Sequence, residues 1–111
     1  MGSHVTTHVL DAVTGTPVQG MAVTLEQFDE GWNLLAIGET DADGRVNDLG
    51  PADLPGGRYR LGFDTGTWFA AAGRPTFYPE VQISFVVSAA DLHCHVTLLL
   101  SPFAYSTYRG S

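Results

Sequence analysis

Apolar and polar residues alternate along most of the chain, and glycine, proline or aspartate interrupts the alternation at short intervals. The clearest case is the segment from Arg58 to Asp64, in which Tyr59, Leu61 and Phe63 fall on one side. A period of two is typical of a β-strand with one buried face, because successive side chains point to opposite sides. Short strands separated by turn residues predict an all-β sandwich.

The same pattern predicts seven or eight strands and one short helix. Strands are expected at residues 5–10, 21–28, 32–39, 58–64, 81–87, 93–100 and 104–109. A helix is expected at residues 67–73, with Gly73 as its end. Residues 1–4 are expected to be a disordered or non-native stub in which His4 is solvated. The whole chain, residues 1–111, is then one domain.

Length and composition support one folded domain. A chain of 111 residues has room for one core, and 44% hydrophobic against 15% charged residues argues against disorder. A core of this size is modest, so an oligomer that buries more surface would be a natural source of stability.

The charged residues narrow the choice of partners. Twelve acidic residues against five basic ones give a formal net charge of -7. The basic residues are all arginines: Arg45, Arg58, Arg60, Arg74 and Arg109. The lack of lysine excludes Schiff-base chemistry. Nucleic acid is not an expected partner, because a phosphate backbone requires a concentrated positive surface. An anionic ligand would have to be bound by one or two arginines in a pocket.

Cysteine content and hydropathy favour a cytoplasmic protein. Cys94 is the only cysteine, so no intrachain disulfide can form, and a reducing compartment is expected. No apolar run reaches the roughly 18 residues that a membrane-spanning helix needs, so no membrane is expected as a partner. The first residues show no signal-peptide pattern.

Three histidines in two predicted strands are the first candidates for chemistry. His8 lies in the first strand, and His93 and His95 share one face of a later strand, with Cys94 on the other face. Histidine changes charge near neutral pH and can act as a general acid or base. A single strand histidine is more often structural, so the number of them is what favours a site. A three-histidine metal site is a minor alternative if the strands are neighbours, but no CxxC or HExxH motif accompanies it.

Arg45 directly follows a predicted tight turn at residues 41–44. It could project from that turn into a pocket, or it could be solvated. The acidic residues of the turn imitate part of a calcium loop, but Gly50 stands where the bidentate glutamate is needed. A serine hydrolase is not expected either, because the chain has no G-x-S-x-G motif.

The C-terminal segment has strong β propensity up to the last residues, at positions 105–108. A strand that runs into the end of the chain would hold Ser111 at a fixed location. The alternative is that residues 109–111 are frayed, as chain ends generally are.

Several segments together resemble a known family. They are Thr7-His8-Val9-Leu10-Asp11, Asp43-Gly44-Arg45, Phe77-Tyr78-Pro79-Glu80-Val81, the run from His93 to Pro102, and Tyr105-Ser106-Thr107-Tyr108-Arg109-Gly110-Ser111. These segments are similar to those of the 5-hydroxyisourate hydrolases, the enzymatic relatives of the transthyretin hormone carrier, over residues 5–111. The terminal Tyr-Arg-Gly-Ser is the most specific piece, because it separates the hydrolases from the carriers. Thr97 stands where the family usually has proline, and Cys94 where it commonly has tyrosine.

The resemblance implies a transthyretin-like (prealbumin) two-sheet β-sandwich that assembles as a homotetramer, a dimer of dimers, with active sites in a channel between dimers. It implies a cofactor-independent cyclic amide hydrolase of purine metabolism. The small-molecule substrate would be the oxidised purine 5-hydroxyisourate, and the product 2-oxo-4-hydroxy-4-carboxy-5-ureidoimidazoline, in urate degradation. The family's catalytic positions correspond to His8, Arg45, His95 and Ser111. Those that shape the substrate pocket correspond to Tyr108, Arg109 and Gly110, and His93 matches a less central position.

These side chains suit the implied reaction. A hydrolase needs an activated water and support for a developing oxyanion. His8 and His95 would together activate water and transfer protons, and the sequence does not say which does which. Arg45 would hold the anionic substrate, and Ser111 would orient water or a carbonyl. The alternative is a non-catalytic transthyretin-like carrier of a small ligand, against which the paired histidines and Arg45 argue.

Overall fold

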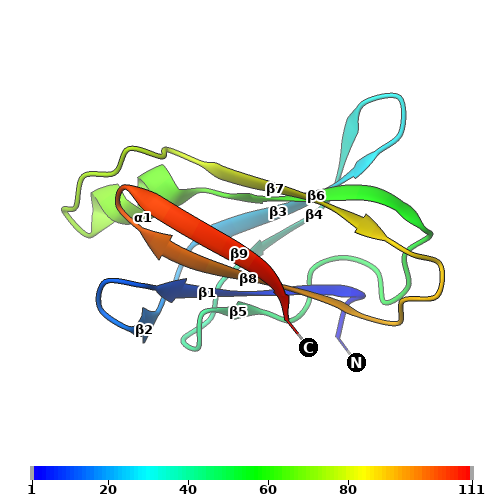
Figure 1. Ribbon diagram of the computed structural model, residues 1–111, viewed down its shortest axis with the longest axis horizontal. Helices are drawn as coiled ribbons and strands as arrows, with labels where there is room; N and C mark the ends of the chain where they lie inside the picture. The colour runs from blue at the N-terminus through cyan, green and yellow to red at the C-terminus, as the bar shows by residue number, and fades with distance from the viewer. Residues whose placement is uncertain (1, 111) are drawn as a thin grey trace.

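The computed structural model describes residues 2–110, which form two packed β-sheets and one short helix (Figure 1). The elements are β1 (Val5–Asp11), β2 (Thr16–Pro17), β3 (Ala22–Phe28), β4 (Trp32–Glu39), β5 (Arg45–Val46), β6 (Gly57–Phe63), α1 (Thr65–Ala71), β7 (Val81–Val87), β8 (Cys94–Ser101) and β9 (Ala104–Gly110). The predicted all-β sandwich is confirmed. All seven predicted strands are present, and β2 and β5 are additional two-residue strands.

The two sheets have different connectivity. Sheet A has the order β2-β1-β8-β9, with β5 also paired to β1, and sheet B has the order β4-β3-β6-β7. Strands β1 and β8 are parallel, whereas the other pairs are antiparallel. The start of β1 and the end of β9 lie near each other, at the end of the molecule away from α1 (Figure 1). Residues from the two ends of the chain are therefore brought onto one sheet.

The core lies between the sheets and is built by alternate residues of their strands, as the period of two requires. The fully buried side chains facing each other across it include Val5, Val9, Leu98 and Leu100 from sheet A and Val23, Leu25, Tyr59, Leu61 and Phe63 from sheet B. Because these positions point inward, the residues between them in sheet A point to the opposite, outer face.

The helix begins and ends two residues earlier than predicted, at Thr65 and Ala71. Asp64 is its N-cap and accepts a hydrogen bond from the Thr67 backbone N–H at 3.3 Å. Gly73 has φ +67° and lies beyond the helix. The prediction assigned Asp64 to the preceding strand and so missed the cap, which is a typical position for aspartate. No helix within residues 2–110 has the length and apolar character to cross a membrane.

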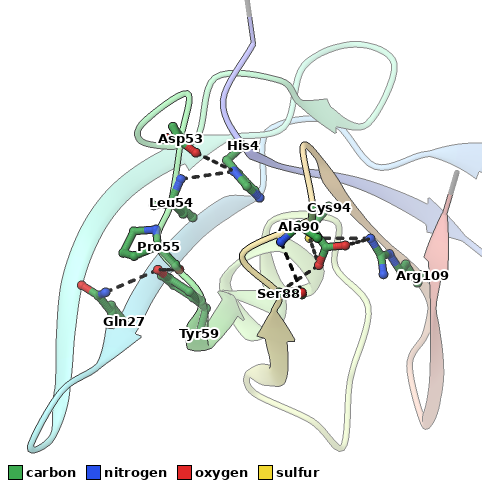
Figure 2. Close-up of polar contacts among 11 residues, drawn as sticks. His4, Gln27, Asp53, Leu54, Pro55, Tyr59, Ser88, Ala90, Cys94 and Arg109 are labelled. Atoms are coloured by element: carbon green, nitrogen blue, oxygen red, sulfur yellow. Dashed lines mark hydrogen bonds and ion pairs between the residues drawn. The ribbon is translucent and has the colours of Figure 1, made fainter.

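The expectation of a solvated His4 in a disordered stub is wrong for the described part of that segment. His4 is only 2% exposed, and Ser3 is buried as well. The His4 Nδ1 atom accepts a hydrogen bond from the Leu54 N–H at 3.2 Å, as Figure 2 shows. The Ser3 hydroxyl accepts one from the Leu49 N–H at 2.7 Å. These contacts dock the segment before β1 against the loop before β6; Met1 lies outside the described residues.

Candidate active site

The candidate site occupies the outer face of sheet A, which we call the histidine face. Its members follow from the strand registers: Thr6 and His8 of β1, Arg45 of β5, His95 and Thr97 of β8, and Tyr108 and Gly110 of β9. Cross-strand partners point to the same side of a sheet, so these residues are neighbours. Three predicted catalytic residues, His8, Arg45 and His95, therefore lie on one surface.

The first row of this face runs Thr6, His95, Gly110 across three neighbouring strands. The Thr6 hydroxyl lies 2.7 Å from His95 Nδ1 and 2.9 Å from His93 Nε2, within hydrogen-bond distance of both. The two imidazole rings are stacked, with centroids 6.3 Å apart and an interplanar angle of 29°. One hydroxyl thus contacts both His93, which directly precedes β8, and His95 of β8.

Gly110 completes this row by leaving space. A Cβ atom at this position would lie 2.6 Å from His95 Cδ2, closer than a methyl group and an aromatic carbon can approach. The Cδ2 atom is bonded to Nε2, the ring nitrogen that does not face Thr6. The His95 ring therefore contacts the Thr6 hydroxyl through Nδ1, and the absence of a side chain at Gly110 leaves room for its Cδ2 edge.

The second row joins His8 to Arg45 on one side and, through Thr97 on the other, to Tyr108. The His8 Nε2 atom lies 2.9 Å from the Asp43 carbonyl oxygen. A carbonyl only accepts, so Nε2–H donates, and Nδ1 is the nitrogen of His8 left for chemistry.

The turn before β5 fixes Arg45. The Asp41 carboxylate accepts hydrogen bonds from the N–H groups of Asp43 and Arg45, both at 2.9 Å. Gly44 has φ +77°, and a Cβ there would collide with the Val9 carbonyl oxygen of β1. Only glycine allows this close approach, which brings Arg45 beside His8. No carboxylate within residues 2–110 pairs with the Arg45 guanidinium, so its charge is not neutralised by that part of the chain.

A cleft of about 560 Å³ opens beside the first row. It is lined by Gly2, Ser3, Thr6, Arg45, Asn47, Ala52, Leu92, His93 and His95. Burial, and after it the positive charges of Arg45, His93 and His8, lower the pKa of His95 from its ordinary value of 6.5. A neutral imidazole beside a permanent cation is suited to accept a proton from a substrate or water while the arginine attracts an anion.

The C-terminal residues divide between two faces. Tyr108 lies on the histidine face and is 56% exposed. Arg109 points to the other side, where its guanidinium lies 3.3 Å from Asp91 Oδ1 and 4.0 Å from Cys94 Sγ; Figure 2 shows Arg109 directed toward Cys94. Arg109 is thus turned away from His95. Ser111 lies outside the described residues.

Cys94 lies on the opposite face of β8 from His95. Cys94 is buried, and burial raises the pKa of its thiol, as expected for a small core residue. Within residues 2–110, no group of three or more His, Cys, Asp or Glu side chains could hold a metal ion, which leaves the three-histidine metal site without support there.

Comparisons with known proteins identify the family. A family model described as HIUase/Transthyretin family matches residues 5–110. The chain belongs to this family. It is 49% identical to the 5-hydroxyisourate hydrolase of Salmonella dublin, over 94% of this chain and 78% of that protein. It is 46% identical to that of Caulobacter vibrioides, over 98% and 99% respectively.

Solved structures of the HIUase/transthyretin family agree with the fold. The Klebsiella pneumoniae 5-hydroxyisourate hydrolase superposes with a TM-score of 0.88 at 43% identity, over 98% of this chain and all of that one. Sea bream transthyretin in complex with thyroxine gives 0.89 at 33% identity, over 96% and 94%. Hydrolase and carrier thus share this backbone, and the side chains must distinguish them.

Sequence reasoning missed Thr6, the residue that contacts both His93 and His95. A signal was present, because Thr6 and His8 are two positions apart and so share one face of β1. The hydroxyl of a strand threonine has many possible partners, however. Only the parallel pairing of β1 with β8 brings it to the two imidazoles.

Proposed function

We propose that this chain hydrolyses 5-hydroxyisourate to 2-oxo-4-hydroxy-4-carboxy-5-ureidoimidazoline, a step of urate degradation, without a cofactor. The observation that carries the proposal is the cleft in which His95, with a lowered pKa, lies near Arg45. Opening a cyclic amide requires a base for water and a positive charge for the oxyanion, and these two side chains supply both.

His95 is the water-activating base in this proposal. Its Nδ1 atom faces the Thr6 hydroxyl, and the neutral ring can take a proton from water on Nε2. Arg45 binds the anionic substrate and stabilises the negative charge that develops as water attacks. His8 keeps Nε2 on the Asp43 carbonyl and, when protonated, donates from Nδ1 to the leaving nitrogen.

The C-terminal residues complete the pocket in this proposal. Gly110 and Tyr108 border His95 and Thr97 on the histidine face, and both would contact the substrate. Ser111 follows Gly110 directly and would orient water or a substrate carbonyl. Arg109 contributes to the pocket indirectly, by anchoring the end of β9 to Asp91.

A homotetramer is part of the proposal. Leu10 and Leu99 are neighbours on the histidine face and only half-buried, so further copies could cover them. Strands β7 and β9 are the last strands of their sheets, and unpaired strand edges are suited to pairing between copies. Light scattering should give about four times the 11.9 kDa chain mass, and a monomer that is fully active would contradict this part. We also propose a cytoplasmic location, as the cysteine content of the sequence led us to expect.

The direct test generates 5-hydroxyisourate in place from urate and a urate oxidase and follows the ultraviolet absorbance with and without this protein. Faster decay that is lost in His95→Asn supports the hydrolase. Decay at the spontaneous rate, with the protein folded, would favour the carrier instead. The carrier is less supported, because the identity to the named hydrolases, 49% and 46%, exceeds the 33% to sea bream transthyretin.

A further inference from the structure

One buried hydroxyl connects the half-buried His95 to the exposed His93. Thr6 is only 6% exposed, and its Oγ1 lies 2.7 Å from His95 Nδ1 and 2.9 Å from His93 Nε2. A hydroxyl has one hydrogen, so it can donate to only one of the two rings and must accept from the other. The arrangement therefore has two alternative hydrogen-bond directions.

We propose that Thr6 is a positioning residue that sets which nitrogen of His95 carries the proton and relays a proton between His95 and His93. This inference rests on the proposed hydrolase function and deepens it. In the state ready for catalysis, His95 Nδ1–H donates to Thr6, and Thr6 donates to His93 Nε2. His95 Nε2, the nitrogen that does not face Thr6, is then unprotonated and can act as the base.

The relay removes the charge that catalysis would leave on His95. When water gives a proton to His95 Nε2, the Nδ1 proton passes to Thr6 Oγ1 and the Thr6 proton passes to His93 Nε2. His95 is then neutral with its proton on Nε2, and His93 is an imidazolium. His8 donates its Nδ1 proton to the leaving nitrogen and takes up a new proton from solvent. When His95 then releases its Nε2 proton to solvent, the same transfers run in reverse, so every proton is accounted for.

The surroundings of the two rings favour this direction of transfer. Arg45 from β5 and His8 from β1 face His95, and burial together with these charges opposes its protonation. His93 is exposed to solvent, which stabilises a positive charge there. Moving the charge from His95 to His93 therefore places it in contact with water.

The first test is a nitrogen NMR measurement on the wild-type protein labelled at histidine. We expect neutral His95 to carry its proton on Nδ1, with an unprotonated Nε2. A neutral His95 that carries its proton on Nε2 would overturn the proposal. This measurement does not depend on turnover, so it separates a failure of the relay from a failure of the proposed function.

The second test compares two threonines of β1. Thr6→Val removes the hydroxyl at nearly constant volume and should lower kcat about tenfold or more with KM little changed. It should also mix the two His95 tautomers in the NMR spectrum, and Thr6→Ser should restore both the wild-type kcat and the single tautomer.

Thr7→Val is the matched control, because the Thr7 hydroxyl is buried on the core side and donates to the Val96 carbonyl at 2.7 Å. That variant should lose stability but keep the wild-type kcat and the His95 tautomer. Equal loss of kcat in Thr6→Val and Thr6→Ser, with an unchanged His95 tautomer, would mean that Thr6 only fills space and would overturn the relay.

Discussion

The two faces of sheet A are made by alternate residues of the same strands. One face packs apolar side chains into the core, and the other holds polar side chains in hydrogen-bonding positions. On the core face, Val9 and Leu98 are fully buried, and their partners across the core are apolar as well. On the histidine face, the Thr6 hydroxyl lies within hydrogen-bond distance of two ring nitrogens, His95 Nδ1 and His93 Nε2. The core face requires volume and apolarity, whereas the histidine face requires particular atoms at particular distances.

This difference means that the two faces should respond to substitution in opposite ways. A change on the core face alters the free energy of unfolding and leaves the chemistry of the folded molecules intact. A change on the histidine face alters turnover at nearly constant stability. Measuring both quantities for variants of one strand, β8, is the most direct way to test the separation.

The largest effect is expected for His95→Asn. Asparagine keeps a polar side chain but cannot act as a base near neutral pH, so kcat/KM should fall by about 100- to 10,000-fold. The thermal midpoint should stay close to that of the wild type, because the half-buried ring contributes little to the core. Turnover within a few fold of the wild type would remove His95 from the reaction.

Leu98→Ala is the corresponding change on the core face of β8. Leu98 is fully buried, so the truncation should cost about 2–5 kcal/mol of unfolding free energy, measured by urea denaturation. The kcat of the remaining folded protein should be unchanged at a temperature well below its midpoint. A loss of kcat as large as that of His95→Asn would show that the two faces are not separate.

The sequence predicted those features of the two faces that depend on residues close together in the chain. The alternation around Tyr59 and Leu61 was sufficient to predict β6 and its buried face, because strand periodicity is a local property. Four catalytic candidates, His8, Arg45, His95 and Ser111, were also predicted, but through the resemblance to known hydrolases. Periodicity alone only placed His93 and His95 on a common face.

The remaining features arise from contacts between distant segments. The burial of His4 depends on the loop that supplies the Leu54 N–H, 50 residues away. The link from Thr6 to His95 spans 89 residues and requires the parallel pairing of β1 and β8. The orientation of Arg109 toward Asp91 follows from the register of β9, which the terminal motif does not encode. None of these can be read from a local pattern.

Gly110→Ala should have an intermediate effect and sharpens the comparison, because it changes shape on the histidine face without removing a catalytic group. Gly110 is not among the glycines with positive φ, so the backbone accepts alanine, but the new Cβ would lie 2.6 Å from His95 Cδ2. The ring must move, and a displacement of about 1 Å can reduce kcat roughly 10- to 100-fold. A crystal structure of the variant should show the shifted ring, and an unshifted ring with full activity would contradict the steric role of Gly110.

The smallest expected effect is that of the Arg45 charge on the pKa of His95. Burial and the charges of Arg45, His93 and His8 lower the pKa of His95 below 6.5. As the pH falls from 6.5 toward that lower pKa, the unfolded chain binds a proton at His95 and the folded protein does not. The free energy of unfolding therefore decreases over this range. The base is lost over the lower part of the same range, and the acidic limb of kcat/KM should have its midpoint below pH 6.5.

Replacing Arg45 with glutamine should raise the pKa of His95 toward 6.5 without restoring it fully, since burial, the largest cause, remains. The NMR titration of the His95 ring measures this shift even if the variant is inactive. Arg58→Gln is the matched control, because it changes the net charge equally but lies over the Phe28 ring on sheet B, 4.1 Å from its centroid. A shift in Arg45→Gln and none in Arg58→Gln would show that a local charge on the histidine face tunes the base. Equal shifts in both variants would mean that His95 responds only to the net charge of the molecule. Arg45 would then have no part in holding His95 neutral, and only its proposed role in binding the substrate would stand.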